Sequence, residues 1–205
     1  MKSNHRINRI SDFWEWFQSN AGALASDPEN PAILNELDQR VRSLAPELSW
    51  EIGPGTSKSW QLVISPDCQQ GFRDLTRSIV AAAPVLQEWE FYPARQPKEW
   101  DYKFELTRES NKETVAIDAT HWTFVLLRYP DGLREVLLKG AGLSAITDDE
   151  RQQAGAIVLE SVLGEDIFMD YVDKFEVLNE LEPRFAAKER PIQSLRTAVM
   201  GTGVA

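Results

Sequence analysis

Three polar residues in the middle of the chain have types and spacing that suit acid–base chemistry. His121 follows Asp118 by three positions at the start of an expected strand, and Arg128 lies further along that strand. An imidazole beside a carboxylate is the arrangement that a general base requires. A histidine that hydrogen-bonds to a turn is the plainer interpretation, because polar residues gather at strand ends. Asp118, His121 and Arg128 are therefore the candidate catalytic residues.

Two of the seven tryptophans are the candidate binding residues. Trp16 falls among polar neighbours in an expected amphipathic helix, and Trp100 falls in an expected loop. Exposed tryptophan is enriched among the residues that dominate the binding energy of protein interfaces. The alternative is that each ring covers a gap between a helix and a sheet.

The sequence predicts no metal site and no cofactor. It contains none of the motifs that mark nucleotide-binding loops, nucleophile elbows or zinc proteases. Two histidines and a single cysteine, Cys68, cannot build a Cys/His zinc site. Asp148, Asp149 and Glu150 offer oxygen ligands for a hard cation. A capping box of Thr147 and Glu150, with acidic residues in the first helical turn, already explains that cluster.

The net charge of the chain indicates which classes of partner it can bind. The chain has 32 acidic and 22 basic residues, which gives a formal net charge of -10. This charge repels phosphate backbones and anionic lipids, so neither a nucleic acid nor a membrane is expected as a partner. A cationic protein fits better, although solubility alone also accounts for an acidic surface. The single cysteine and the lack of an apolar N-terminal run predict a cytoplasmic protein.

The apolar pattern predicts the helices that position these residues. Steps of three and four predict one helix over residues 10–24 and a second over residues 31–44, capped by Asn30. A third helix is expected to end before Pro84, and a fourth to begin after Thr147 and end at Gly164.

Strand-like segments alternate with turn formers over much of the remaining chain. Residues 48–52 and 59–65 predict a hairpin around GPGTSK, and residues 88–139 predict a sheet. Tyr129-Pro130-Asp131-Gly132 has the signature of a type I turn between two of its strands. The fold class is therefore α+β, with a mainly antiparallel sheet covered by an N-terminal helical hairpin and two further helices.

Residues 165–181 fit both a strand and a helix. We expect a strand, because a second helix directly after a glycine stop is less economical. The sequence therefore predicts a single α+β domain over residues 1–181 and a tail over residues 182–205. The segment IQSLRTAV in this tail is expected to form a short docking helix. QPKEWD, residues 96–101, is the best internal boundary.

An ordered series of segments carries a family resemblance: FWEWF, LDQRVRSLAPELSWEIGPG, WEFYPARQP, ATHWTFVLLRYPDG and TDDERQQAGAIVLESVLGED. The chain resembles an uncharacterised family of small acidic bacterial proteins, known as a domain of unknown function. The resemblance covers residues 13–181 and consists of helix caps, turns and aromatic core positions. It implies a bacterial cytoplasmic origin, one continuous unit and a strand after Gly164, and it assigns no activity to any residue.

The leading hypothesis is a non-catalytic binding or regulatory protein, such as an inhibitor or immunity-type partner of a basic protein. The acidic composition and the two tryptophans support it. One alternative is a small enzyme whose acid–base site in the sheet region uses Asp118, His121 and Arg128. The other is a domain that binds a small ligand in an aromatic pocket. Composition leaves the oligomeric state open.

Overall fold

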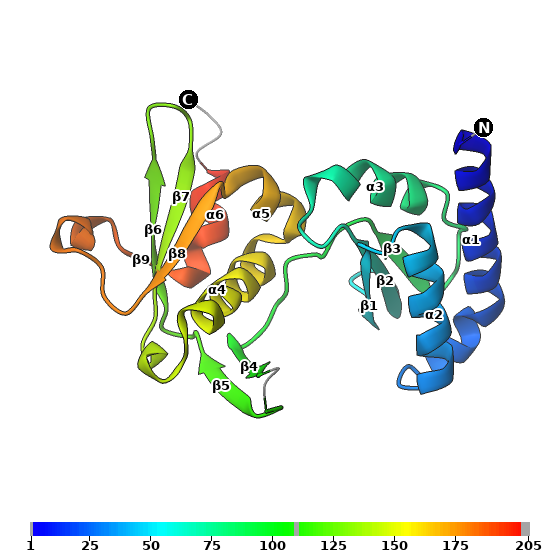
Figure 1. Cartoon of the computed structure of the whole chain (residues 1–205), viewed down its shortest axis with the longest axis horizontal. Coiled ribbons are helices and arrows are strands. Elements are labelled where there is room, and N and C mark those ends of the chain that lie inside the picture. Colours follow the sequence, from blue (N-terminus) through cyan, green and yellow to red (C-terminus); the bar gives the residue numbers. More distant parts are fainter. Residues whose placement is uncertain (1, 109–110, 202–205) are drawn as a thin grey trace. The chain divides into compact units, whose positions relative to one another are not determined.

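The protein forms two compact units in a computed structural model that describes residues 2–108 and 111–201 (Figure 1). Unit 1 is Met1–Arg95 and unit 2 is Gln96–Ala205. Each unit has a hydrophobic core of its own, with Trp89 in the first and Trp122 in the second. The division falls at the start of the expected boundary segment, residues 96–101. It differs from the expected grouping of residues 1–181 as one domain.

Unit 1 begins with the expected helical hairpin and continues into a small sheet. Its elements are α1 (Lys2–Ser26), α2 (Pro31–Leu44), β1 (Ser49–Pro54), β2 (Trp60–Ser65), a 3₁₀ turn (Gln70–Phe72), α3 (Arg73–Ala81) and β3 (Trp89–Tyr92). The Asn30 side chain accepts a hydrogen bond from the N–H of Ala32 at 3.1 Å, which caps α2 as predicted. The first helix begins earlier than the apolar pattern indicates, at Lys2.

The sheet of unit 1 has the order β1-β2-β3. The β1–β2 pair is the predicted antiparallel hairpin, whereas β3 returns through α3 and pairs parallel with β2. Tryptophan side chains tie α1 to the rest of the unit: Trp14 Nε1–H donates to the carbonyl of Ile79 on α3 at 2.8 Å, and Trp89 Nε1–H on β3 donates to that of Ala21 on α1 at 3.2 Å. These two buried indole groups therefore find the partners that they need.

Unit 2 contains two further sheets and three helices within the described residues. Its elements are β4 (Lys103–Thr107), β5 (Thr114–Asp118), β6 (Thr123–Arg128), β7 (Arg134–Lys139), a 3₁₀ turn (Leu143–Ala145), α4 (Asp148–Leu163), α5 (Glu165–Tyr171), β8 (Lys174–Leu178), η3 (a 3₁₀ segment, Pro183–Lys188), β9 (Arg190–Pro191), a 3₁₀ turn (Ile192–Ser194) and α6 (Leu195–Met200). β4 and β5 form a two-stranded sheet, and the larger sheet has the order β8-β7-β6-β9.

The expected local signals of unit 2 are confirmed. The turn between β6 and β7 is closed by hydrogen bonds from Gly132 N–H to the carbonyl of Tyr129, and from Tyr129 N–H to that of Leu133, both at 2.9 Å. Gly132 has a φ of 89°, which a glycine adopts without strain. Thr147 and Glu150 form the capping box at the start of α4. The α+β class with mainly antiparallel sheets is likewise confirmed.

The expectation of a strand over the whole of residues 165–181, after Gly164, is wrong. The segment forms α5 first and β8 only from Lys174. Gly164 has a φ of 79°, so the chain changes direction there and a second helix can begin at once. Glu165 and Asp166 stand in the first turn of α5, where the helix dipole favours negative charge.

The expectation of a single sheet is also corrected, because the strands of the described residues form three separate sheets. Two pairs of neighbouring strands are parallel, β2 with β3 and β7 with β8, and each pair is joined by a helical connection. The three-stranded sheet of unit 1 and the β6-β7-β8 part of unit 2 thus share one topology: a hairpin, a helical crossover and a third strand parallel to the second.

The expected C-terminal tail contributes to the core of unit 2. β9 pairs with β6, and the predicted docking helix is present as α6. Ile192, Leu195 and Val199 are buried in the core of unit 2. Residues 202–205 of that segment lie outside the described residues. Over the ranges 2–108 and 111–201, none of the helices combines the length and the apolar character that a membrane crossing requires.

Candidate functional site

Asp118 and His121 lie together at an exposed turn between β5 and β6. Asp118 ends β5, and His121 stands in a turn that Trp122 closes by donating its N–H to the carbonyl of Ala119 at 3.0 Å. Hydrogen bonds from Thr120 chiefly hold the pKa of Asp118 below its ordinary value, and the nearby charges of Lys103 and His121 add to this effect. Asp118 is thus an ionised, solvent-exposed carboxylate at neutral pH.

Arg128 lies at the opposite end of β6 from this turn. Thr123 and Arg128 are the first and last residues of the strand, and five steps at about 3.3 Å each separate them by roughly 17 Å. Arg128 lines a pocket that contains neither Asp118 nor His121. The structure therefore brings two of the three candidate catalytic residues together and leaves the third apart.

Trp16 is half-buried on α1 and is engaged within its own unit. The guanidinium carbon of Arg40 on α2 lies 4.9 Å from the centre of a Trp16 ring, the distance of a cation–π contact. This cation occupies a face of the indole that a partner would otherwise contact. Trp16 here joins the two helices of the hairpin.

Trp100 is half-buried before β4 and packs against the core of unit 2. Its ring lies 5.1 Å from that of Tyr102 and 5.8 Å from that of Phe104, centre to centre. The indole N–H is buried, and within the described part of the chain it has no hydrogen-bond partner. Trp100 thus covers an edge of the core more than it projects into solvent.

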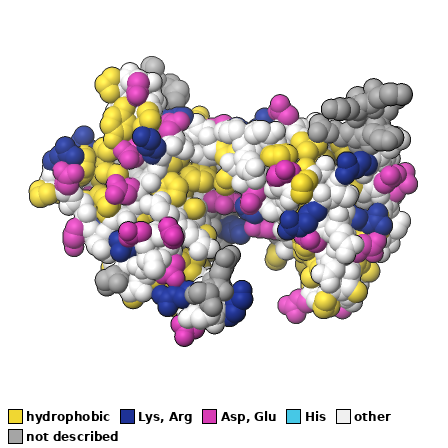
Figure 2. All heavy atoms as spheres, in the orientation of Figure 1, with side chains coloured by type: hydrophobic (Ala, Val, Ile, Leu, Met, Phe, Trp, Pro, Cys, Tyr) yellow, Lys and Arg dark blue, Asp and Glu magenta, His cyan; other side chains and the backbone are white. Residues whose placement is uncertain are grey.

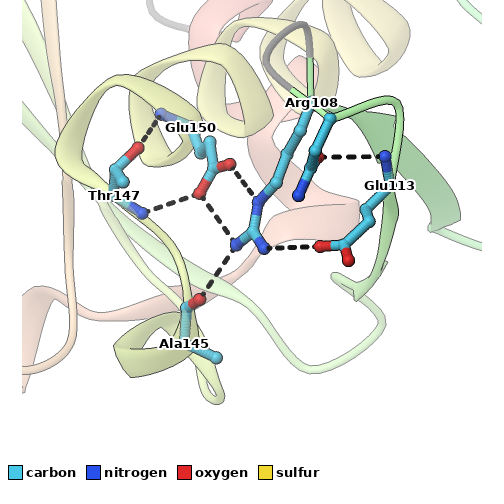
Figure 3. A network of polar contacts seen from close by, with 6 residues as sticks. Arg108, Glu113, Ala145, Thr147 and Glu150 are labelled. Atoms are coloured by element: carbon cyan, nitrogen blue, oxygen red, sulfur yellow. Dashed lines mark hydrogen bonds and ion pairs between the residues drawn. The ribbon is translucent and has the colours of Figure 1, made fainter.

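Glu150, in the first turn of α4, belongs to a network of polar contacts that joins two parts of unit 2 (Figure 3). Arg108, after β4, donates from Nε to Glu150 at 2.7 Å, and its Nη1 lies 3.7 Å from Glu113. The side chain of Arg108 thus extends between the two carboxylates (Figure 3). Glu150 also accepts from the N–H of Thr147 at 2.8 Å. Chiefly through the hydrogen bond from Arg108, the pKa of Glu150 falls below its usual value.

Glu90 is a carboxylate that the sequence did not single out. It lies on β3 in unit 1, is only 9% exposed, and receives hydrogen bonds from the N–H of Thr56 and from the N–H and hydroxyl of Ser57. Those donors belong to the loop between β1 and β2, so Glu90 holds the loop closed. The hydrogen bond from the Ser57 hydroxyl is the main reason that the pKa of Glu90 is lowered.

Charge is distributed unevenly within unit 2. The unit has 20 acidic and 13 basic residues, a net charge of -7. On the face shown in Figure 2, acidic side chains are scattered over the unit with basic side chains between them. At the free edge of the larger sheet, which we call the β8 edge, Glu176 lies on β8 and Glu180 shortly after it. Both are exposed, and neither forms an ion pair with another described residue.

The opposite edge of the same sheet, the β9 edge, carries cations. Lys188 and Arg190 join Arg128 there around a pocket, although Arg128 is distant from them in the sequence. Of these three cations, only Arg128 was predicted from the sequence to be a site residue. Lys188 and Arg190 could have been found from the alternation of charge in Lys188-Glu189-Arg190, because alternate side chains of an extended segment point to the same side.

Comparisons of the chain with protein-family models, with curated proteins and with solved structures find no match. The resemblance to a family of small acidic bacterial proteins therefore stays a prediction.

Proposed function

We propose that this chain is a non-catalytic binding protein whose partner is a cationic protein. The observation that carries the proposal is the β8 edge of unit 2, where Glu176 and Glu180 are exposed and without an ion-pair partner among the described residues. The net charge of -7 on the unit adds a long-range attraction for a cationic partner, which raises the rate of encounter.

The position of β8 supplies the second part of the argument. β8 is the first strand in the order β8-β7-β6-β9, so in the described part of the chain no strand pairs with one side of its backbone. An extended segment of a partner can pair with such an edge, and its side chains then lie beside those of the edge strand. A basic segment would meet Glu176 directly and Glu180 just beyond the strand.

The test is capture of partners from a lysate of the native cells by the full-length chain at about 0.05 M and about 0.5 M salt, because added salt screens surface charge. Captured proteins are identified by mass spectrometry. We expect basic proteins at low salt and their loss at high salt. The double variant Glu176→Lys/Glu180→Lys should lose them at either concentration.

A matched control separates local contacts from net charge. Glu29→Lys/Glu47→Lys makes the same change in formal charge at two exposed carboxylates of unit 1. It should retain most of the capture that the β8-edge variant loses. Capture of acidic partners alone, or an equal loss in both double variants, would contradict the proposal. In the latter case only net charge would matter, and the β8 edge would not be the binding surface.

A further inference from the structure

A pocket of about 250 Å³ lies at the β9 edge, on the opposite side of the sheet from the acidic β8 edge. Three cationic residues line it, Arg128 from β6, Lys188 from η3 and Arg190 from β9. Its apolar lining includes Phe124 and Leu126 of β6 and Ala198 of α6. The pocket therefore combines concentrated positive charge with an apolar floor.

The register of the strands explains why these side chains share one side. Phe124 is paired directly with Arg190, so their side chains lie on the same face of the sheet. Leu126 and Arg128 follow Phe124 at steps of two and lie on that face as well. Between the two cations, Glu189 turns to the other face, where it accepts a hydrogen bond from the Thr123 hydroxyl at 2.6 Å.

The three cations of the pocket have no neutralising partner within residues 2–108 and 111–201. Among the described residues, no ion pair or side-chain hydrogen bond is found for Arg128, Lys188 or Arg190. Carboxylates are nevertheless close in sequence, because Glu189 pairs with Lys139 at 2.5 Å and Glu182 pairs with Arg184 at 2.9 Å. In a unit with a net charge of -7, three uncompensated cations around one pocket favour an anion from outside.

Backbone donors at the same edge add to this preference. Tyr129 N–H donates to Leu133 on the β7 side, so the alternate residues Leu126 and Arg128 direct their N–H groups away from β7. Pairing of β6 with β9 covers only Thr123 and Phe124. The N–H groups of Leu126 and Arg128 thus lie beyond the paired part of the edge, and such groups bind carboxylate oxygens well.

We propose that this pocket binds a small organic anion: a carboxylate attached to an apolar chain or ring. The charged head is held by Arg128, Lys188 and Arg190, and the apolar body lies on Leu126 and Ala198, beside the buried Phe124. The volume is slightly below the range of about 300–1,000 Å³ that is typical of drug-sized ligands, which indicates a small molecule. This ligand site is independent of the β8 edge and of any protein partner bound there.

The probes are sodium hexanoate and sodium benzoate, each compared with its neutral amide, hexanamide or benzamide, and with inorganic phosphate. Binding to the full-length chain is measured by calorimetric titration. Both carboxylates should bind saturably, with the amides and phosphate at least about tenfold weaker, a difference that corresponds to loss of one strong polar interaction. Equal affinity for the amides, or phosphate binding as tightly as the carboxylates, would overturn the assignment.

Substitutions in and away from the pocket test whether the anion binds there. Arg128→Ala/Arg190→Ala should weaken hexanoate binding at least about tenfold, because both substitutions remove charge from the head-group position. Ala187→Trp, at an exposed position in the pocket lining, should block the site without removing any charge. Lys174→Ala removes an exposed cation from the β8 edge of the same sheet and should leave the affinity unchanged. Circular dichroism checks that each variant is folded, and unchanged binding in folded Ala187→Trp would sink the proposal.

Discussion

Glu90 shows how a single carboxylate can organise a loop. β3 places its side chain in a nearly fully buried position. The loop between β1 and β2 directs N–H and hydroxyl donors at the carboxylate. Gly55 makes this approach possible, because a Cβ at that position would lie 2.8 Å from Glu90 Oε1 and 2.5 Å from the carbonyl oxygen of Lys58. A polar group this buried is tolerated because it is fully hydrogen-bonded.

The first prediction follows from the lowered pKa of Glu90. A carboxyl group whose pKa is lower in the folded than in the unfolded state stabilises the fold above its unfolded pKa of about 4.3. That contribution is lost as the pH falls through the folded value. Glu90→Gln should therefore destabilise the protein at pH 7 and have a smaller effect at about pH 3, because the carboxyl of the unfolded chain is protonated there and part of the stabilisation is lost.

Urea denaturation at the two pH values measures this difference. The matched control is Glu88→Gln, which changes an exposed carboxylate two residues away. Glu88→Gln should leave the unfolding midpoint nearly unchanged at both pH values. If Glu90→Gln cost the same at low and neutral pH, its effect would come from packing and not from the charge.

At the scale of elements, α4 and β8 approach each other closely at a glycine. A Cβ on Gly155 would lie 2.4 Å from a methyl carbon of Val177 and 3.0 Å from the ring of Phe175. Both neighbours are on β8, so the glycine sets the distance between the helix and the strand. Gly22 on α1 is a natural comparison, because a Cβ added there would have no neighbour within 4 Å among the described residues outside its own helical turn.

The second prediction contrasts these two glycines. Alanine is the better helix former by about 1 kcal/mol, so Gly22→Ala should stabilise the protein by about 0.5–1 kcal/mol. Gly155→Ala should instead destabilise it by about 1–3 kcal/mol, since overpacking outweighs propensity. Chemical denaturation of each variant gives the two free energies, and stabilisation by Gly155→Ala would contradict the packing described here.

Elements specified by local signals could be predicted from the sequence, and those specified by distant contacts could not. Asn30 with Pro31, the Tyr129–Gly132 turn and the Thr147–Glu150 box each act within a few residues. The parallel pairing of β3 and the start of α5 depend on what the folded chain brings alongside them. The candidate site shows the same limit, because only the pairing of β6 with β9 places Arg190 near Arg128.

At the scale of the whole molecule, the two cores predict two folding units. Residues 1–95 and 96–205 each bury their own cluster of apolar side chains, and the chain just after the division is tied to unit 2 by a hydrogen bond from Lys98 N–H to the carbonyl of Ser161 at 2.8 Å. Each fragment, produced alone, should show the circular dichroism expected from its helices and a cooperative thermal transition. An unfolded fragment of either kind would show that one core depends on the other unit.

The topology that the two sheets share has a consequence for the order in which they fold. The hairpins β1–β2 and β6–β7 close over short turns, whereas β3 and β8 must wait for residues 66–88 and 140–173 to bring them back. Closing the longer loops costs more chain entropy, so the hairpins should be structured in the folding transition state while β3 and β8 join later. Val177→Ala on β8 should then mainly speed unfolding, and Val136→Ala on β7 should mainly slow folding, in stopped-flow kinetics.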